Sequence, residues 1–309
     1  AIKSCPQMAD AFLNLSVLYS KKGDYDSAIE NAKKAVAIRE DSKFRLALAR
    51  YLVEKNLLIE AEENYNSVRK IEPKNTKALQ GLSVVYEKNQ KFEDAIDVLI
   101  QASQEDPNDW LTFFNLGAIY DRIGREDEAL NAYLRAVSLR SEEFSSQYFL
   151  GLSFWRLGKY DEALPPLEKA SEINRNDPRV FQALGVVHQA RKDYQKAELA
   201  FQKAVELNPE DISSMIQLAA ILLTEKQASK AVEVSEKIIA KDQKNSKAHT
   251  ILGLGKLQLG DYEGAQKSLL LAVEEDEVNA LALYNLGVAY QRLGKTDEAQ
   301  KSINKAKEL

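Results

Sequence analysis

The stretch WLTFFNLGAIYDRIGREDEALNAYLRAVSLR, residues 110–140, contains the pattern that decides the fold of this chain. Phe113, Leu116 and Tyr120 recur at helical spacing and form one apolar face. Gly124 follows them as a typical helix-ending residue, because glycine enters the left-handed region at little cost. A second amphipathic run comes after the glycine. The stretch therefore predicts two helices joined by a tight turn.

The same pattern recurs along the chain with a period of 34 residues. An alanine marks the second helix of every unit: Ala28, Ala61, Ala95, Ala129, Ala163, Ala197, Ala231, Ala265 and Ala299. Thirteen residues before each of these alanines stands a leucine, and the residue after that leucine is always small. One helical pair cannot bury both of its apolar faces, so neighbouring units must stack. The sequence predicts an all-α solenoid.

This pattern resembles the tetratricopeptide repeat (TPR) family, with residues 110–140 and 280–309 nearest to the family pattern. The resemblance implies a right-handed superhelix whose first helices line a concave surface, where members usually bind an extended peptide or a partner's helix. We expect an N-terminal flank, residues 1–8, and a single array from residue 9 to residue 309. The expected repeats are 9–41, 42–75, 76–109, 110–143, 144–177, 178–211, 212–245, 246–279 and 280–309.

Two units depart from the pattern. Asn56 and Lys226 stand where a turn glycine is usual, and Ala228 replaces an aromatic residue, which makes these units candidate soft joints. Pro165 and Pro166 fall inside a predicted second helix, where they should remove backbone hydrogen bonds and bend the helix locally.

Composition excludes several classes of protein. The 309 residues are 45% hydrophobic and 29% charged, with a net charge of −5, which argues against disorder and against nucleic-acid binding. The only cysteine is Cys5, so neither a disulfide framework nor a thiolate metal site is expected within one chain. The densest apolar run, residues 215–223, is too short for a membrane span. A soluble protein is expected, with the cytoplasm favoured.

The stretch AYQRLGKT, residues 289–296, matches the spelling of a phosphate-binding loop. Shifting the frame by the repeat places Gly294 in the same inter-helix turn as Gly124, Gly158 and Gly260. A phosphate loop needs a preceding strand and a free arc of backbone N–H groups. A helix is predicted before this turn instead, so no nucleotide is expected.

No other catalytic or metal constellation is apparent. His188 and His249, the only histidines, fall in positions that aromatic residues occupy in other units, and they are read as core residues. The pair Asp127 and Glu128 lies where a second helix begins, and acidic residues favour the helix dipole there. The chain is predicted not to be an enzyme, with no cofactor and no metal.

The positions that should face the concave surface are unusually basic. They hold ten cations and four acids, whereas the whole chain is net negative. The cations are Lys21, Lys43, Arg50, Lys77, Lys88, Arg122, Arg156, Arg179, Lys247 and Arg292, and the acids are Asp10, Glu54, Glu87 and Asp121. Five of the cations end first helices, where the helix dipole already favours them. Lys77, Arg179 and Lys247 begin first helices and are therefore more informative.

Apolar side chains also fall in these positions, in three groups: Phe114, Tyr148, Phe149, Leu152 and Trp155; Ile216, Ile251, Leu254 and Leu257; and Tyr284 with Val288. Exposed aromatic residues mark interaction surfaces. The alternative for Phe149 and Leu152 is contact with a neighbouring unit. The predicted partner-binding groove consists of Lys77, Phe114, Asn115, Arg122, Tyr148, Leu152, Trp155, Arg156, Arg179, Lys247, Tyr284 and Asn285.

Two subtypes of the family are not matched. Chaperone-binding members hold a partner's carboxylate in a clamp of Lys, Asn and Arg side chains. In this chain Asn14 and Lys43 match two clamp positions, but Ala47 stands where the clamp arginine is required. The asparagine ladder of the glycosyltransferase type is filled only by Asn14, Asn115 and Asn285.

Two functions remain open from the sequence. The first is a scaffold or adaptor that holds an extended or helical protein segment, acidic and with apolar anchors, in its concave groove. The alternative is a substrate-recruiting or regulatory segment of a larger enzyme or assembly, which the lack of a polar capping helix before Leu309 would suit. The same feature predicts self-association through the ends of the array.

Overall fold

The computed structural model describes residues 6–309, which form eighteen α-helices with no strand among them. The first helices of the pairs are α1 (Pro6–Lys21), α3 (Ser42–Glu54), α5 (Thr76–Lys88), α7 (Trp110–Arg122), α9 (Phe144–Arg156), α11 (Pro178–Ala190), α13 (Ile212–Thr224), α15 (Ser246–Gln258) and α17 (Ala280–Arg292). The second helices are α2 (Tyr25–Ile38), α4 (Leu58–Ile71), α6 (Phe92–Glu105), α8 (Glu126–Leu139), α10 (Tyr160–Ile173), α12 (Tyr194–Leu207), α14 (Ala228–Lys241), α16 (Tyr262–Glu275) and α18 (Thr296–Glu308). The predicted all-α class is confirmed.

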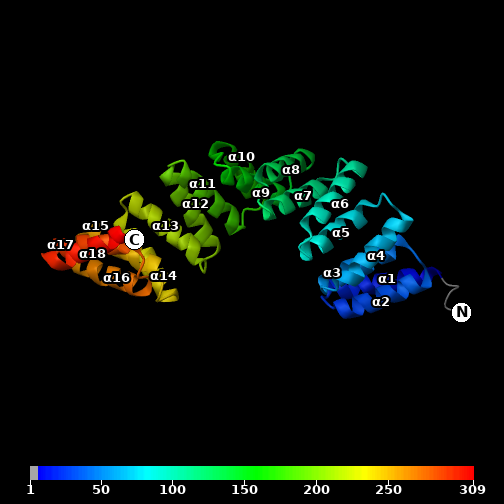
Figure 1. Cartoon of the computed structure of the whole chain (residues 1–309), viewed down its shortest axis with the longest axis horizontal. Helices are drawn as coiled ribbons and strands as arrows, with labels where there is room; N and C mark the ends of the chain where they lie inside the picture. Colours follow the sequence, from blue (N-terminus) through cyan, green and yellow to red (C-terminus); the bar gives the residue numbers. More distant parts are fainter. Residues whose placement is uncertain (1–5) are drawn as a thin grey trace. The chain divides into compact units, whose positions relative to one another are not determined.

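The helices are labelled in chain order in Figure 1. They divide into two compact units, an N-terminal unit up to Ser153 and a C-terminal unit from Phe154 onward. In the N-terminal unit α1, α3, α5 and α7 each pack on the second helix that follows, and α1, α3 and α5 also contact one another in turn. In the C-terminal unit α13, α15 and α17 are related in the same way. These successive first helices therefore form a continuous face in each unit, which we call the first-helix face.

The turn between the first and the second helix of every repeat uses a residue in the left-handed region. Glycine holds five of them, with φ between +70° and +79°, at Gly23, Gly124, Gly158, Gly260 and Gly294. Asn56 and Lys226 adopt φ values of 57° and 58°, and Gln90 and Lys192 do the same at 60° and 65°. The substitutions at Asn56 and Lys226 therefore keep the turn geometry, at a steric cost that glycine avoids.

The repeated alanines are buried in the core. Eight of the nine have no exposed surface, and Ala299 is 5% exposed. The small residue of the first helix lies against a large side chain of the second helix. A Cβ at Gly117 would stand 2.6 Å from the Tyr133 ring, and one at Gly185 would stand 2.7 Å from the Phe201 ring. These pairings let two helix backbones approach while a ring fills the space beside them.

Polar side chains join neighbouring repeats at the N-termini of first helices. Gln182 Nε2 donates to Asp211 Oδ2 at 2.5 Å and to Ser214 Oγ at 2.6 Å, where Asp211 is the N-cap of α13. Gln80 makes the same contacts with Asp109, the N-cap of α7, and with Thr112. Each of these glutamines ties the cap of the next repeat to its own helix.

The positions of three single residues test predictions made from the sequence. His188 and His249 are buried, at 7% and 5% exposure, as predicted, and His249 Nε2 lies 2.9 Å from the Gln243 carbonyl oxygen. Gly294 lies in the turn between α17 and α18, as predicted, and Lys295 is the N-cap residue of α18. These residues follow a helix and not the strand that a phosphate loop requires.

Other predictions are only partly addressed. Residues 6–8 of the expected flank belong to α1, and residues 1–5 with Cys5 lie outside the described residues. Pro165 and Pro166 lie within α10, which continues through both. A proline ring removes the amide donor, so two helical hydrogen bonds are absent there. Local bending of α10 stays a prediction.

Candidate functional site

A cleft of about 1120 Å³ opens on the first-helix face of the N-terminal unit. Leu46 and Ala47 of α3, Tyr65 of α4 and Leu111 of α7 form its apolar part. Its rim comes from the N-terminus of α3, from the turn before α5 and from the first two turns of α5. Because the repeat brings equivalent helix starts together, residues 31–34 positions apart in sequence share this one cleft. We call it the basic cleft.

Four cations rim the basic cleft: Lys43, Arg50, Lys74 and Lys77. Lys74 Nζ is 2.8 Å from Glu105, and Lys43 Nζ is 3.4 Å from Asp10. The contact with Glu105 raises the pKa of Lys74, so this side chain stays protonated at neutral pH. Exposed pairs of this kind contribute little and can exchange partners.

Two carboxylates also line the cleft, but both serve the local structure. Asp41 is the N-cap of α3, where it accepts the backbone N–H of Lys43 at 2.9 Å. Glu72 accepts a hydrogen bond from the Asn75 side chain at 2.6 Å. The cations outnumber these carboxylates, and the cleft is therefore attractive to anionic groups.

Lys77 and Arg50 are the least compensated of these cations. Among the residues described, neither forms an ion pair, although the Arg50 guanidinium lies 5.4 Å from the centre of the Tyr51 ring. Lys77 is exposed at the second position of α5, and its N-cap is the uncharged Asn75. Neither the helix dipole nor a capping carboxylate explains a cation at this position.

Tyr65 reaches the basic cleft from the second helix of its repeat. A Cβ at Gly81 would stand 2.2 Å from the Tyr65 ring, so only glycine leaves room for this ring beside α5. Burial raises the pKa of the Tyr65 hydroxyl to about 12, while the charge of Arg50 opposes the shift. Tyr65 therefore stays neutral and adds an apolar ring with a hydroxyl to a cationic cleft.

An aromatic cluster follows on α7, α8 and α9 of the same unit. The Phe114 ring lies 5.8 Å from the rings of both Tyr133 and Phe149, and Tyr148 lies 5.3 Å from Phe149. Phe114, Tyr148 and Phe149 are half-buried, whereas Tyr133 is fully buried. The rings therefore pack partly on one another and leave part of their surface exposed. Phe149 accordingly both contacts its neighbours and keeps some exposed surface, so it combines the two alternatives given for it, an exposed groove residue and a contact between units.

The remaining predicted groove residues of this unit differ in their surroundings. Asn115 and Leu152 are half-buried. Arg122 is exposed, and its Nη1 atom lies 2.5 Å from Glu87 of the preceding repeat. This pair neutralises one of the ten inner cations with one of the four inner acids.

The C-terminal unit holds the other predicted groove residues. Trp155 is half-buried, and Arg156 and Lys247 are exposed. Arg179 lies 2.6 Å from Asp177, the N-cap of α11, and this contact lowers the pKa of Asp177. The N-cap of the helix that carries Lys247 is the uncharged Asn245. Arg179 thus has a local carboxylate partner that the sequence pattern did not reveal.

The last first helix carries an exposed apolar pair. Tyr284 is 51% exposed, and Leu281, one turn earlier on α17, is 56% exposed. Asn285 is half-buried and donates a hydrogen bond to the Leu281 carbonyl at 2.8 Å. Ile251 was expected to extend this apolar surface, but it is 7% exposed and belongs to the core, so that expectation is wrong.

No cluster of metal-ligating side chains is found in the described part of the chain. No helix among residues 6–309 combines the length and apolar character that crossing a bilayer demands.

The fold and its first-helix faces define a repeat protein of the α-solenoid class. Models of the tetratricopeptide repeat match residues 9–42, 52–116, 112–143, 142–210, 188–254 and 280–309. The chain belongs to the tetratricopeptide repeat family, as the sequence pattern indicated. No curated protein matches it in sequence.

Several solved structures share the fold. The C-terminal part of a TPR protein from Cytophaga hutchinsonii aligns with a TM-score of 0.65 at 21% identity, over 78% of this chain and 99% of that one. PilF from Pseudomonas aeruginosa aligns at 0.60 and 18%, over 72% and 98%. YrrB, described as a TPR protein with an unusual peptide-binding site, aligns at 0.56 and 24%, over 60% and 95%. At these identities the likeness concerns the fold alone.

Proposed function

We propose that this chain is a non-catalytic protein-interaction scaffold whose first-helix face holds a segment of a partner protein. Members of its family generally act as interaction scaffolds, and YrrB shows a peptide-binding site on the same fold. Both histidines are built into the core, and the acidic pair Asp127 and Glu128 lies in the first turn of α8. These placements favour recognition over catalysis.

The basic cleft is the observation that carries the proposal. Arg50 offers a planar fork suited to a carboxylate, and Lys43, Lys74 and Lys77 add point charges around it. The apolar floor of Leu46, Ala47 and Leu111 would take a side chain next to such a carboxylate. We therefore infer that the bound segment is acidic, with apolar residues between its carboxylates.

Apolar anchors are proposed at two further places. Phe114 and Tyr148 keep part of their rings open in the N-terminal unit, and Tyr284 with Leu281 is exposed in the C-terminal unit. Aromatic side chains supply much of the binding energy of protein interfaces. The net charge of −5 disfavours nucleic acid as the partner.

The experiment is capture from a lysate with the immobilised chain, followed by quantitative mass spectrometry. A Lys43→Glu/Lys77→Glu variant is compared with the unchanged chain and with Lys33→Glu/Lys34→Glu, which carries the same charge change on α2. We expect a set of acidic proteins to be retained by the unchanged chain and by the α2 variant. The cleft variant should lose that set.

Salt provides a second criterion. Retention through the basic cleft should fall when ionic strength rises from about 0.1 M to about 1 M, because the Debye length shrinks from roughly 10 Å to roughly 3 Å. Loss of the same proteins from both variants, or from neither, would rule the cleft out as the binding surface.

A further inference from the structure

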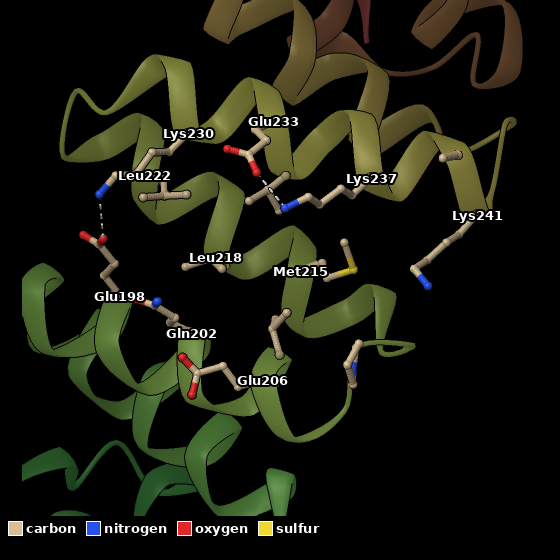
Figure 2. A pocket seen from close by; sticks show the side chains of 14 residues that line it. Glu198, Gln202, Glu206, Met215, Leu218, Leu222, Lys230, Glu233, Lys237 and Lys241 are labelled. Carbon is tan, nitrogen blue, oxygen red and sulfur yellow. Dashed lines mark hydrogen bonds and ion pairs between the residues drawn. The ribbon is translucent and has the colours of Figure 1, made fainter.

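Neighbouring repeats of this molecule meet through one recurring contact, in which a second helix covers the first helix that follows it. We call it the stacking contact. Where α16 covers α17, Leu269 and Ala272 of α16 belong to one buried cluster with Leu286 and Ala289 of α17. The corresponding contact between α12 and α13 is visible in Figure 2, where Leu218 lies on the side of α13 that faces α12. A covered first helix therefore presents an apolar stripe to the repeat before it.

The same stripe is uncovered on α1. Leu15 and Leu18 stand at the positions of Leu286 and Ala289. Leu15 is 42% exposed, whereas the leucine at its position is at most 7% exposed in each of the other eight repeats. Leu18 is 56% exposed, although its position is buried in all eight of those repeats. Met8, which is 42% exposed, continues the stripe at helical spacing. An apolar surface of this kind marks an interaction site.

At the other end of the described array, α18 presents the opposite half of the stacking contact. Ile303 and Ala306 stand at the positions of Leu269 and Ala272. Ala306 is half-buried, whereas the eight residues at its position in the other repeats have no exposed surface. Ile303 is also half-buried, and the residues at its position in the other repeats are at most 5% exposed. α18 therefore offers the surface that covers a first helix elsewhere in the molecule.

Ion pairs accompany the stacking contact inside the array. Lys55 Nζ lies 2.9 Å from Asp26 of the preceding repeat, and Arg191 Nε lies 3.0 Å from Asp161 of the preceding repeat. In both pairs the cation stands six residues before the repeated alanine of its own unit. The acid stands two residues before the repeated alanine of the preceding unit. The pair therefore belongs to a fixed register between two repeats.

The two ends of the described array carry the two halves of this ion pair. Lys22 holds the cation position of the first repeat, and Asp297 holds the acid position of the last one. Both side chains are exposed, and neither forms an ion pair within the part of the chain that the structure describes. The ends are thus complementary in charge as well as in apolar surface.

We propose that the chain stacks end to end with a second copy of itself, so that α18 of one copy covers α1 of the next. Ile303 and Ala306 then pack on the apolar stripe of α1, and Asp297 pairs with Lys22. Two different surfaces meet in this contact, so each copy keeps one free end and further copies can add. The contact uses no residue of the basic cleft, and an assembly would therefore present one basic cleft for each copy.

Sedimentation velocity of the full chain at several concentrations tests the proposal. The mass of the unchanged chain should rise with concentration. Leu18→Lys places a charge in the stripe of α1, and Ala306→Gln adds a long side chain where the contact needs alanine, so each variant alone should stay monomeric. Mixed in equal amounts, the two variants should form a complex of two copies and no more, because each supplies the end that the other has lost.

Charge reversal tests the register of the contact. Lys22→Asp and Asp297→Lys should each weaken association at least about fivefold, and a chain that carries both changes should regain it, because the pair is restored with opposite signs. This swap depends on neither blocking substitution, so it decides the proposal even if one of them unfolds an end helix.

Leu199→Lys is the matched control, because Leu199 is 67% exposed on α12 and lies at neither end of the array. It should leave association unchanged. The proposal is overturned if the unchanged chain stays monomeric at every concentration, if the mixed variants do not associate, or if Leu199→Lys abolishes association as well. Association of each blocked variant by itself would also overturn it, because the copies would then meet through another surface.

Discussion

The ring of Tyr133 lies directly against the backbone of Gly117, and a Cβ at residue 117 would come within 2.6 Å of the ring. Tyr133 has no exposed surface, and its hydroxyl donates to Asp121 at 3.2 Å. The ring therefore cannot move aside without losing both packing and a hydrogen bond. This contact between a first and a second helix is repeated by Gly185 and Phe201.

Replacing Gly117 with alanine should lower the free energy of unfolding by about 1–3 kcal/mol, because the added methyl overpacks the helix crossing. Urea denaturation followed by circular dichroism measures the change. In the double variant Gly117→Ala/Tyr133→Leu, the smaller side chain should relieve the clash, so the two changes should not add. Equal stability of Gly117→Ala and the unchanged chain would contradict this role of the glycine.

This part of the fold could be predicted from the sequence alone. The small residue after each leucine recurs with the period, and a large side chain stands four residues after the alanine in seven of the nine units, so the pattern itself indicates which positions meet. The backbone conformation of the turns was harder to predict from the sequence. Asn56 and Lys226 suggested looser joints, yet they adopt the same left-handed conformation as the glycines, and so do Gln90 and Lys192.

Replacing Lys226 with glycine should stabilise the chain. Lys226 has φ +58°, and a non-glycine residue in this region costs about 1–2 kcal/mol, from which the greater flexibility of unfolded glycine is subtracted. The net gain should be up to about 1 kcal/mol in urea denaturation. Asn56→Gly should gain less, because asparagine tolerates this region better. A loss of stability in Lys226→Gly would show that its side chain has a compensating role.

Stability should fall below about pH 6.5 through His188. Burial lowers the pKa of His188 from its usual value of 6.5, with a further contribution from Lys196 and opposition from Asp193. A base with a lowered folded pKa binds fewer protons when folded than when unfolded. Its contribution is fully present above the unfolded pKa and is lost as pH falls through the folded pKa.

The urea midpoint should therefore decrease between about pH 7.5 and about pH 5, and the decrease should be smaller in His188→Phe. Phenylalanine suits the position because Tyr120 and Tyr290 stand in the same register. An identical pH dependence in the variant would mean that other groups govern acid stability.

Ala163 and Trp155 should respond differently to substitution. Ala163 has no exposed surface, so Ala163→Phe should overpack the core and cost about 1–3 kcal/mol. Trp155 is half-buried, and Trp155→Ala should spare most of the stability and weaken partner binding instead. Thermal melts of both variants and a partner-capture assay make the comparison. A melting loss in Trp155→Ala as large as that in Ala163→Phe would place Trp155 in the core.

Only some of the residues that line the basic cleft could be predicted from the sequence. The register placed Lys43, Arg50 and Lys77 on one face, and they do line one cleft. Lys74 lies in the turn before α5 and Tyr65 on a second helix, so neither belongs to a first-helix position. Their place in the cleft depends on how neighbouring repeats approach. The pair of Arg122 with Glu87 also joins two repeats, which a pattern read one unit at a time cannot reveal.

The central claim is that a partner segment lies against α3 and α5 in the basic cleft. Lysine acylation measured by mass spectrometry, with and without a captured partner, tests it most directly. The account predicts that Lys43, Lys74 and Lys77 react more slowly in the complex, while Lys33 and Lys34 on α2 react at unchanged rates. Unchanged reactivity of the three cleft lysines in a complex that has demonstrably formed would contradict it.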